Sequence, residues 1–145
     1  MLKKCDNQFY GNYYSGKEFC NVSDYKITDG IKVMGKKILS LGCGGCDDIC
    51  YLLEKNEVWG IDSSEAAIKI SQSLGVKTKK ADLEDKLDFP DCYFDIVICK
   101  DVIEHLLSPE NLLCEIRRIL KDDGFIIINV PNHFYWYFRL RILFG

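Results

Sequence analysis

The 145-residue sequence lacks several features that would each point to a particular class of protein. It has no apolar run of the ~18 residues that a membrane-spanning helix needs, and its first residues lack the apolar core of a secretory signal. Its net charge is −3, so no overall basic field attracts nucleic acid. It has only three prolines, and we find no internal repeat or low-complexity segment. We therefore expect a cytoplasmic, globular domain with a packed core.

Cysteine, by contrast, is frequent, with eight residues. Most of them lie within strand and helix patterns, which does not suggest the disulfide framework of a small secreted protein. Cys43 and Cys46 have the C-x-x-C spacing of a redox or metal site, but no second such pair completes a zinc site. Because both belong to a glycine-rich loop, we expect a structural role for them, with redox or metal use as the alternative, and we predict no metal.

The chain is organised around that glycine-rich loop, which follows a short apolar run at residues 37–41. Gly42, Gly44 and Gly45 lie within four positions, and a helical pattern comes next. Glycine lets the backbone turn sharply and approach a ligand, and N–H groups at a helix start can bind an anion. The dinucleotide fingerprint would need glycine at Asp47, and the phosphate loop of nucleotide hydrolases is absent. We therefore predict a cofactor loop that serves neither NAD nor ATP.

Apolar strand patterns alternate with helical patterns five times, which predicts an α/β protein with a parallel sheet. The expected strands are 37–41, 57–62, 76–81, 94–99 and 125–130. Helices are expected after the glycine loop, from residue 63 and from residue 108. Their predicted buried residues are Ile49, Leu52 and Leu53 in the first, Ala67, Ile70 and Leu74 in the second, and Leu112, Leu113, Ile116, Ile119 and Leu120 in the third. Residues 121–124 are predicted to form a turn.

Acidic residues follow the predicted second and third strands, at the edge of a parallel sheet where ligands bind. Asp62 lies about 20 residues past the first glycine, the spacing at which a carboxylate binds a ribose diol. A carboxylate suits this task because it can accept from both hydroxyls. Asp82, one strand further out, is placed to reach an adenine amino group. The alternative for both residues is a solvated turn aspartate.

Six stretches in a specific order carry a family resemblance: 38–44, 59–62, 81–83, 94–98, 101–106 and 120–124. In these the chain resembles the class I S-adenosylmethionine-dependent methyltransferases. The tail at 130–141 is similar to methionine-biosynthesis protein W. The resemblance implies a Rossmann-like three-layer α/β/α sandwich with strand order 3-2-1-4-5 and without the usual last two strands. It also implies S-adenosylmethionine as cofactor and methyl transfer to a small molecule. The core would be 37–132, after an extension or lid at 1–36.

The resemblance also implies a set of cofactor contacts along the chain. These are Leu41, Gly42, Cys43 and Gly44 for the methionine part, Asp62 and Ser63 for the ribose, Asp82 and Leu83 for the adenine, and Cys99 and Lys100 in the methyl-donor pocket. Two positions depart from the family pattern, because Ser40 replaces an acid and Cys46 replaces a glycine. They favour an alternative function, a cofactor-binding regulatory or partner module with little catalysis.

Asp101 and His105 are the candidate catalytic residues. If the stretch is helical, their spacing puts them on one face together with Glu104. Similar stretches bind magnesium in some methyltransferases, and His105 would otherwise serve as a general base or as part of a cap or pocket wall.

The predicted fifth strand, 125–130, is almost wholly apolar and would form an open edge, which natural proteins avoid. An apolar, aromatic helix is expected at 133–145, too poor in basic residues for a membrane surface. We therefore expect either that the chain is part of a protein of roughly 200 residues or more, or that it forms a homodimer through this strand and helix.

Overall fold

The computed structural model describes residues 32–46 and 49–131. All of them belong to one compact unit, Lys32–Gly145. Most of the predicted extension or lid at 1–36, the helix at 133–145 and nearly all of the tail at 130–141 lie outside the described residues. Those assignments therefore stay predictions.

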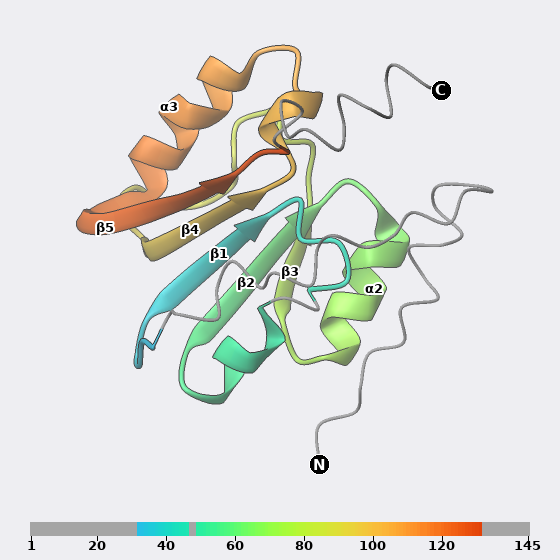
Figure 1. Cartoon of the computed structure of the whole chain (residues 1–145), viewed down its shortest axis with the longest axis vertical. Helices are drawn as coiled ribbons and strands as arrows, with labels where there is room; N and C mark the ends of the chain where they lie inside the picture. Colours follow the sequence, from blue (N-terminus) through green and yellow to red (C-terminus); the bar gives the residue numbers. More distant parts are fainter. Residues whose placement is uncertain (1–31, 47–48, 132–145) are drawn as a thin grey trace, which may run out of the picture. The chain divides into compact units, whose positions relative to one another are not determined.

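Five parallel strands form the sheet: β1 (Lys37–Leu41), β2 (Glu57–Asp62), β3 (Lys77–Lys80), β4 (Phe94–Lys100) and β5 (Leu120–Asn129). Their order is β3-β2-β1-β4-β5, and every neighbouring pair is parallel (Figure 1). This confirms the predicted Rossmann-like α/β fold and its strand order. β4 is buried over six consecutive residues, because a central parallel strand is covered on both faces.

The two faces of the sheet are covered by different helices, because successive side chains of a strand point to opposite faces. Leu39 and Ile61 pack in one core cluster with Leu112 and other residues of α3 (Pro109–Ile119). On β2, Gly60 faces the other way, towards the glycine loop. Helix α2 (Glu65–Ser73) contacts β2 and β3 and covers that side of the sheet (Figure 1).

The helix after the glycine loop is shorter than the sequence predicts. It is a 3-10 helix, η1 (Cys50–Glu54), in which Leu52 is buried. The side-chain amide of Asn56 donates to the carbonyl of Leu52 at 2.9 Å and to that of Val33 at 3.0 Å. These bonds bind the end of the helix to the segment before β1, so it cannot continue.

The apolar side predicted for α2 is only partly buried. Ala67 is buried as expected, but its buried companions are Ile68 and Ser71, whereas Ile70 and Leu74 are half-buried. The hydroxyl of Ser71 bonds to the glycine loop, and this contact turns the helix about its axis relative to the purely apolar stripe.

Two further predictions fail around α3 and the start of β5. Leu113 is 42% exposed, because the core-facing side of α3 passes through Leu112, Ile116 and Ile119. The segment 121–124 is not a separate turn, since β5 already begins at Leu120. Leu120 pairs with Phe94 and Phe125 with Ile96, so residues 121–124 are accommodated as an irregularity in the register. Leu120, predicted as part of the stripe, is therefore a strand residue.

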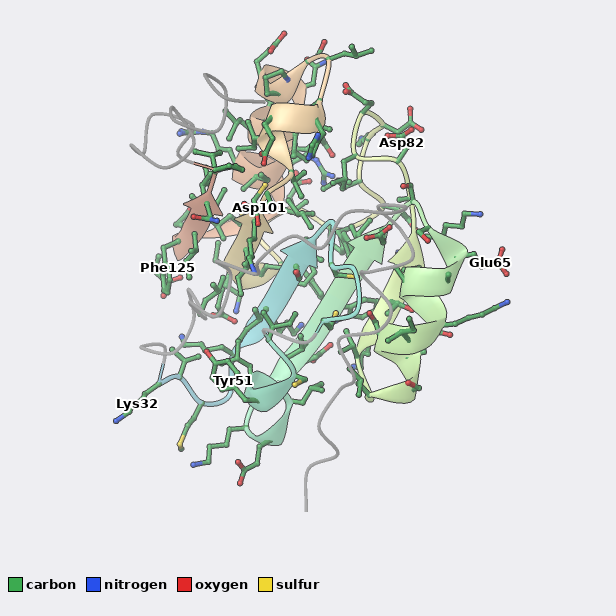
Figure 2. The ribbon with its side chains drawn as sticks, turned by 45° about the vertical axis from the view of Figure 1, so that its right-hand side comes forward. Lys32, Tyr51, Glu65, Asp82, Asp101 and Phe125 are labelled. Atoms are coloured by element: carbon green, nitrogen blue, oxygen red, sulfur yellow. The ribbon has the colours of Figure 1, made fainter. Side chains whose placement is uncertain are left out.

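Among the described strands, β5 pairs with β4 alone. Phe125, Ile128 and Val130 are 47%, 44% and 52% exposed, and Figure 2 shows Phe125 on the outer side of this edge. In the described part of the chain, no helix has the length and hydrophobicity needed to cross a bilayer.

Candidate functional site

The carboxyl ends of the strands come together at one edge of the sheet. Leu41 at the end of β1 pairs with Ile61 on one side and Cys99 on the other. At the end of β4, Lys100 pairs with Asn129. Figure 2 shows Asp82 and Asp101 at this edge. Nearly all of the site residues predicted from the sequence therefore lie on strand ends, or loops after them, that share one edge.

The glycine loop needs glycine for both conformational and steric reasons. Gly42 has φ +60° and Gly44 has φ +49°, in the left-handed region that side chains disfavour. A Cβ on Gly42 would overlap with Cγ2 of Val102. The loop after β1 therefore packs directly against the loop after β4, and no local pattern in the sequence indicates this contact with Val102.

Asp62 is held in place by two backbone N–H groups. Its Oδ2 accepts from the N–H of Gly44 at 2.9 Å, and its Oδ1 accepts from the N–H of Ser64 at 2.8 Å. Ser64 also caps α2 through its hydroxyl, which accepts from the N–H of Ala67. Each carboxylate oxygen has two lone pairs, so one lone pair on each oxygen remains for a ligand. Asp62 is only half-buried, and this arrangement suits a pair of neighbouring hydroxyls. Ser63, beside it, is exposed.

Sequence reasoning missed the contribution of Ser71 to the loop. Its hydroxyl donates to the carbonyl of Gly44 at 2.8 Å, and it lies 3.8 Å from Sγ of Cys43. Ser71 is completely buried. The available signal was a serine four residues after the buried Ala67, on the same face of a helix. Both backbone polar groups of Gly44 are therefore bound by side chains, the N–H by Asp62 and the carbonyl by Ser71.

The turn after β3 carries the two residues predicted to bind an adenine. Asp82 is exposed, and its Oδ1 accepts from the N–H of Glu84 at 3.0 Å. Leu83 is half-buried and packs against the core. Oε1 of Glu84 accepts from the N–H of Leu107, so this turn is tied to the segment that follows β4. Asp82 therefore stabilises its own turn.

The end of β4 presents a buried thiol followed by a strained aspartate. Cys99 is fully buried, and burial, together with the charge of Glu104, raises the pKa of its thiol to about 11. Lys100 is half-buried. Asp101 has φ +52°. Its N–H donates to the carbonyl of Asn129 at 3.0 Å, and Nδ2 of Asn129 donates to its Oδ1 at 3.0 Å. Asn129, at the end of β5, thus positions Asp101 in the loop after β4, a pairing that sequence spacing cannot reveal.

The prediction that Asp101, Glu104 and His105 share one helical face is wrong. The 3-10 helix η2 covers only Ile103–His105, and the left-handed backbone of Asp101 lies before it. All three side chains are exposed. Among residues 32–46 and 49–131, no group of three or more His, Cys, Asp or Glu side chains is placed to hold a metal ion.

Comparison with known proteins agrees with this geometry. Residues 39–128 match the methyltransferase domain family. The chain belongs to the class I S-adenosylmethionine-dependent methyltransferases. Its cofactor is accordingly S-adenosylmethionine, and the residues present fit this ligand, because the half-buried carboxylate of Asp62 is held by two N–H groups in an orientation that suits a pair of neighbouring hydroxyls.

Individual relatives cover part of this methyltransferase chain. The ubiquinone biosynthesis O-methyltransferase of Maricaulis maris is 30% identical over 118 residues, which are 75% of this chain and 46% of that relative. The PH0226 protein of Pyrococcus horikoshii is 34% identical with a TM-score of 0.59, covering 70% of this chain and 51% of that one. An S-adenosylmethionine-dependent methyltransferase of Thermotoga maritima has a TM-score of 0.65 at 24% identity, covering 77% and 52%. The chain thus spans about half the length of the curated relatives that it matches.

Proposed function

We propose that the chain carries out S-adenosylmethionine-dependent methyl transfer to a small-molecule acceptor. The observation that carries the proposal is the carboxylate of Asp62, fixed by the N–H groups of Gly44 and Ser64 with one lone pair free on each oxygen. The cofactor supplies an activated methyl group on a sulfonium. The protein's part is to hold donor and acceptor in line, so positioning supplies most of the catalysis.

The roles of the remaining residues follow the strand ends. Leu41, Gly42, Cys43 and Gly44 would hold the methionine part, Asp62 and Ser63 the ribose, Asp82 and Leu83 the adenine, and Cys99 and Lys100 the methyl-donor pocket. The buried thiol of Cys99, neutral because its pKa is about 11, fits an apolar wall. Asp101, held by Asn129, and the exposed His105 are the proposed catalytic residues on the acceptor side.

The proposal is tested by methyl transfer from labelled S-adenosylmethionine to a panel of metabolites. Because the Maricaulis maris relative is named as a ubiquinone biosynthesis O-methyltransferase, the panel should include hydroxylated ubiquinone precursors. Transfer to one acceptor, lost in Asp62→Ala, supports the proposal. The absence of transfer to every acceptor, by a chain that binds the cofactor, contradicts it.

One observation favours a second function, a cofactor-binding regulatory or partner module with little catalysis. Cys46 occupies a left-handed conformation, φ +56°, at a position where the family has glycine, and Ser40 stands where it has an acid. Cofactor binding without transfer would support this function.

We propose further that the chain works in the cytoplasm, does not bind nucleic acid and forms a homodimer through β5 and the C-terminal segment. The net charge of −3 supports the absence of nucleic-acid binding. The exposed side chains of Phe125, Ile128 and Val130 support the homodimer.

A further inference from the structure

Two reduced thiols lie buried beneath the glycine loop. Cys43 is 6% exposed and Cys46 is 1% exposed, and neither belongs to a disulfide. A Cβ built on Gly60 of β2 would lie 2.7 Å from Sγ of Cys43 and 3.4 Å from Sγ of Cys46. Both sulfurs therefore lie over the same residue of the sheet, in space that a side chain at position 60 would otherwise fill.

The backbone between the two cysteines already has the shape that a disulfide requires. The N–H of Cys46 donates to the carbonyl of Cys43 at 2.8 Å and closes a four-residue turn. Such a turn keeps its end Cα atoms within about 7 Å, and disulfides usually join Cα atoms about 4.4–6.8 Å apart. The two sulfurs can therefore bond with only small movements of the loop.

The local chemistry sets these cysteines apart from the buried thiol of Cys99. A hydrogen bond with the Cys46 thiol is the main cause that lowers the pKa of Cys43; burial opposes it and Ser71 assists it. Burial instead raises the pKa of Cys99. Cys46 also keeps a left-handed φ of +56°, which strains any residue with a side chain. Cys46, in its strained backbone conformation, thus lies in hydrogen-bonding contact with Cys43, and the lowered pKa of Cys43 favours the thiolate, which is the reactive form of cysteine.

We propose that Cys43 and Cys46 are a modification site, at which hydrogen peroxide forms a reversible disulfide within the glycine loop and weakens cofactor binding. The Cys43 thiolate attacks one peroxide oxygen, the O–O bond breaks, and the released hydroxide takes a proton to become water. Cys43 is then a sulfenic acid. The Cys46 sulfur attacks it, its thiol proton passes to the leaving hydroxide, and a second water departs. Two thiols are oxidised and one peroxide is reduced, and an added dithiol reverses the change.

The expected loss of cofactor affinity rests on the proposed function. It follows from the position of Gly44 between the two cysteines, inside the ring that a Cys43–Cys46 disulfide closes. Its N–H orients Asp62 and its carbonyl accepts from Ser71. Drawing the two sulfurs from non-bonded contact to a bond of about 2.05 Å moves this peptide. We expect the affinity for S-adenosylmethionine to fall at least fivefold on oxidation and to return on reduction.

The test uses the full chain in reduced, peroxide-treated and re-reduced form, with calorimetric titration of S-adenosylmethionine for each. Trypsin releases the loop as one peptide, residues 38–55, which also contains Cys50. The C50S variant leaves only the two loop cysteines in that peptide, so mass spectrometry after alkylation assigns the disulfide directly. C50S should keep both the disulfide and the affinity change. C46G, in which glycine accepts the left-handed φ, should show equal affinity with and without peroxide.

Each outcome separates this inference from the proposed function. Loop cysteines that are alkylated after peroxide treatment, or a bond to Cys50 in the unmodified chain, overturn the disulfide. A disulfide that changes the affinity less than twofold overturns the effect on binding. A reduced chain that does not bind S-adenosylmethionine contradicts the proposed function, whereas the disulfide is decided by the peptide map alone.

Discussion

Asp62 is oriented before a ligand arrives, because the loop after β1 and the start of α2 each supply one N–H group to its carboxylate. The two oxygens therefore keep a fixed separation and direction. A ligand diol that binds them incurs no cost for ordering the side chain, and preorganisation of this kind raises affinity.

Replacement of Asp62 by alanine should lower the affinity for S-adenosylmethionine at least tenfold. The two hydrogen bonds to a charged group that would be lost are worth about 1.5–3 kcal/mol each at most. Calorimetry measures the effect, and Asp82→Ala, an exposed turn residue on the next strand, is the comparison at the adenine end. Unchanged affinity in Asp62→Ala would remove it from the ribose site.

Site residues that follow from the order of strands and turns along the chain could be predicted from the sequence. Contacts that form only when distant elements pack together could not. Asp62 and the glycines could be placed because strand ends and turn residues follow from local patterns. The bond of Ser71 to Gly44 and the bond of Asn129 to Asp101 could not, because their partners lie 27 and 28 positions away. Such pairs depend on how α2 and β5 pack, which no local spacing encodes.

Among the elements, the guanidinium of Arg118 ties α3 to the connection between β3 and β4 at several points. Arg118 donates to the carbonyls of Leu87 and Phe89 at 2.8 Å each, and to Asp91 and Glu115 at 2.7 Å. Its side chain is only 21% exposed. The fork shape of the guanidinium fits this set, which a lysine cannot reproduce. This contact fixes the connection that begins with the turn at Asp82 and Leu83.

Arg118→Ala should reduce the free energy of unfolding by about 2–3 kcal/mol, because it leaves two carbonyls and two carboxylates without their shared donor. Urea denaturation measures this. Arg117→Ala is the matched control, since Arg117 is the exposed neighbour on the same helix, and it should change stability by less than about 0.5 kcal/mol. Equal losses in the two variants would mean that Arg118 does not tie α3 to the connection.

The same contact predicts a pH dependence. The hydrogen bond from Arg118 is the main cause that lowers the pKa of Glu115 below its ordinary value of 4.5, against partial burial and with help from the N–H of Leu87. A carboxyl with a lowered pKa in the folded state stabilises the fold above pH 4.5. That contribution is lost as the pH falls through the folded-state value.

The stability difference between the unmodified chain and Glu115→Gln should therefore be constant near neutral pH and shrink below pH 4.5. Urea denaturation at a series of pH values measures it. A difference that grows on acidification would mean that the pKa is raised instead.

At this scale the strands were predictable because each is a short apolar run or an edge with lysines. The lengths and buried faces of the helices were harder to predict. The length of η1 depends on the bond from Asn56 to Val33, 23 residues earlier, and the buried faces of α2 and α3 depend on which side of the sheet each helix meets. Apolar residues such as Leu113 fit the helical period and are nevertheless exposed.

On the scale of the whole molecule, the described sheet ends in β5, an edge strand with half-exposed apolar side chains. Edges of this kind pair with further chain segments or with other molecules unless they are protected. The matched part of this chain covers 46% and 49% of two of the relatives that it matches.

We expect this chain to scatter light as a dimer. Phe125→Glu, which places a charge on the exposed edge, should shift it towards the monomer. Leu107→Glu, an equal change at a 93% exposed residue after η2, should leave the dimer intact. A monomeric unmodified chain that binds no apolar dye would contradict self-association through β5.

The strand ends around Asp62 should bind S-adenosylmethionine, and calorimetric titration of the reduced chain measures this binding. We expect one site per chain, with S-adenosylmethionine displaced by S-adenosylhomocysteine and no heat of binding for NAD, since Asp47 stands where the dinucleotide fingerprint needs glycine. A reduced chain that does not bind S-adenosylmethionine, or that binds NAD in its place, would show that these strand ends are not an S-adenosylmethionine site.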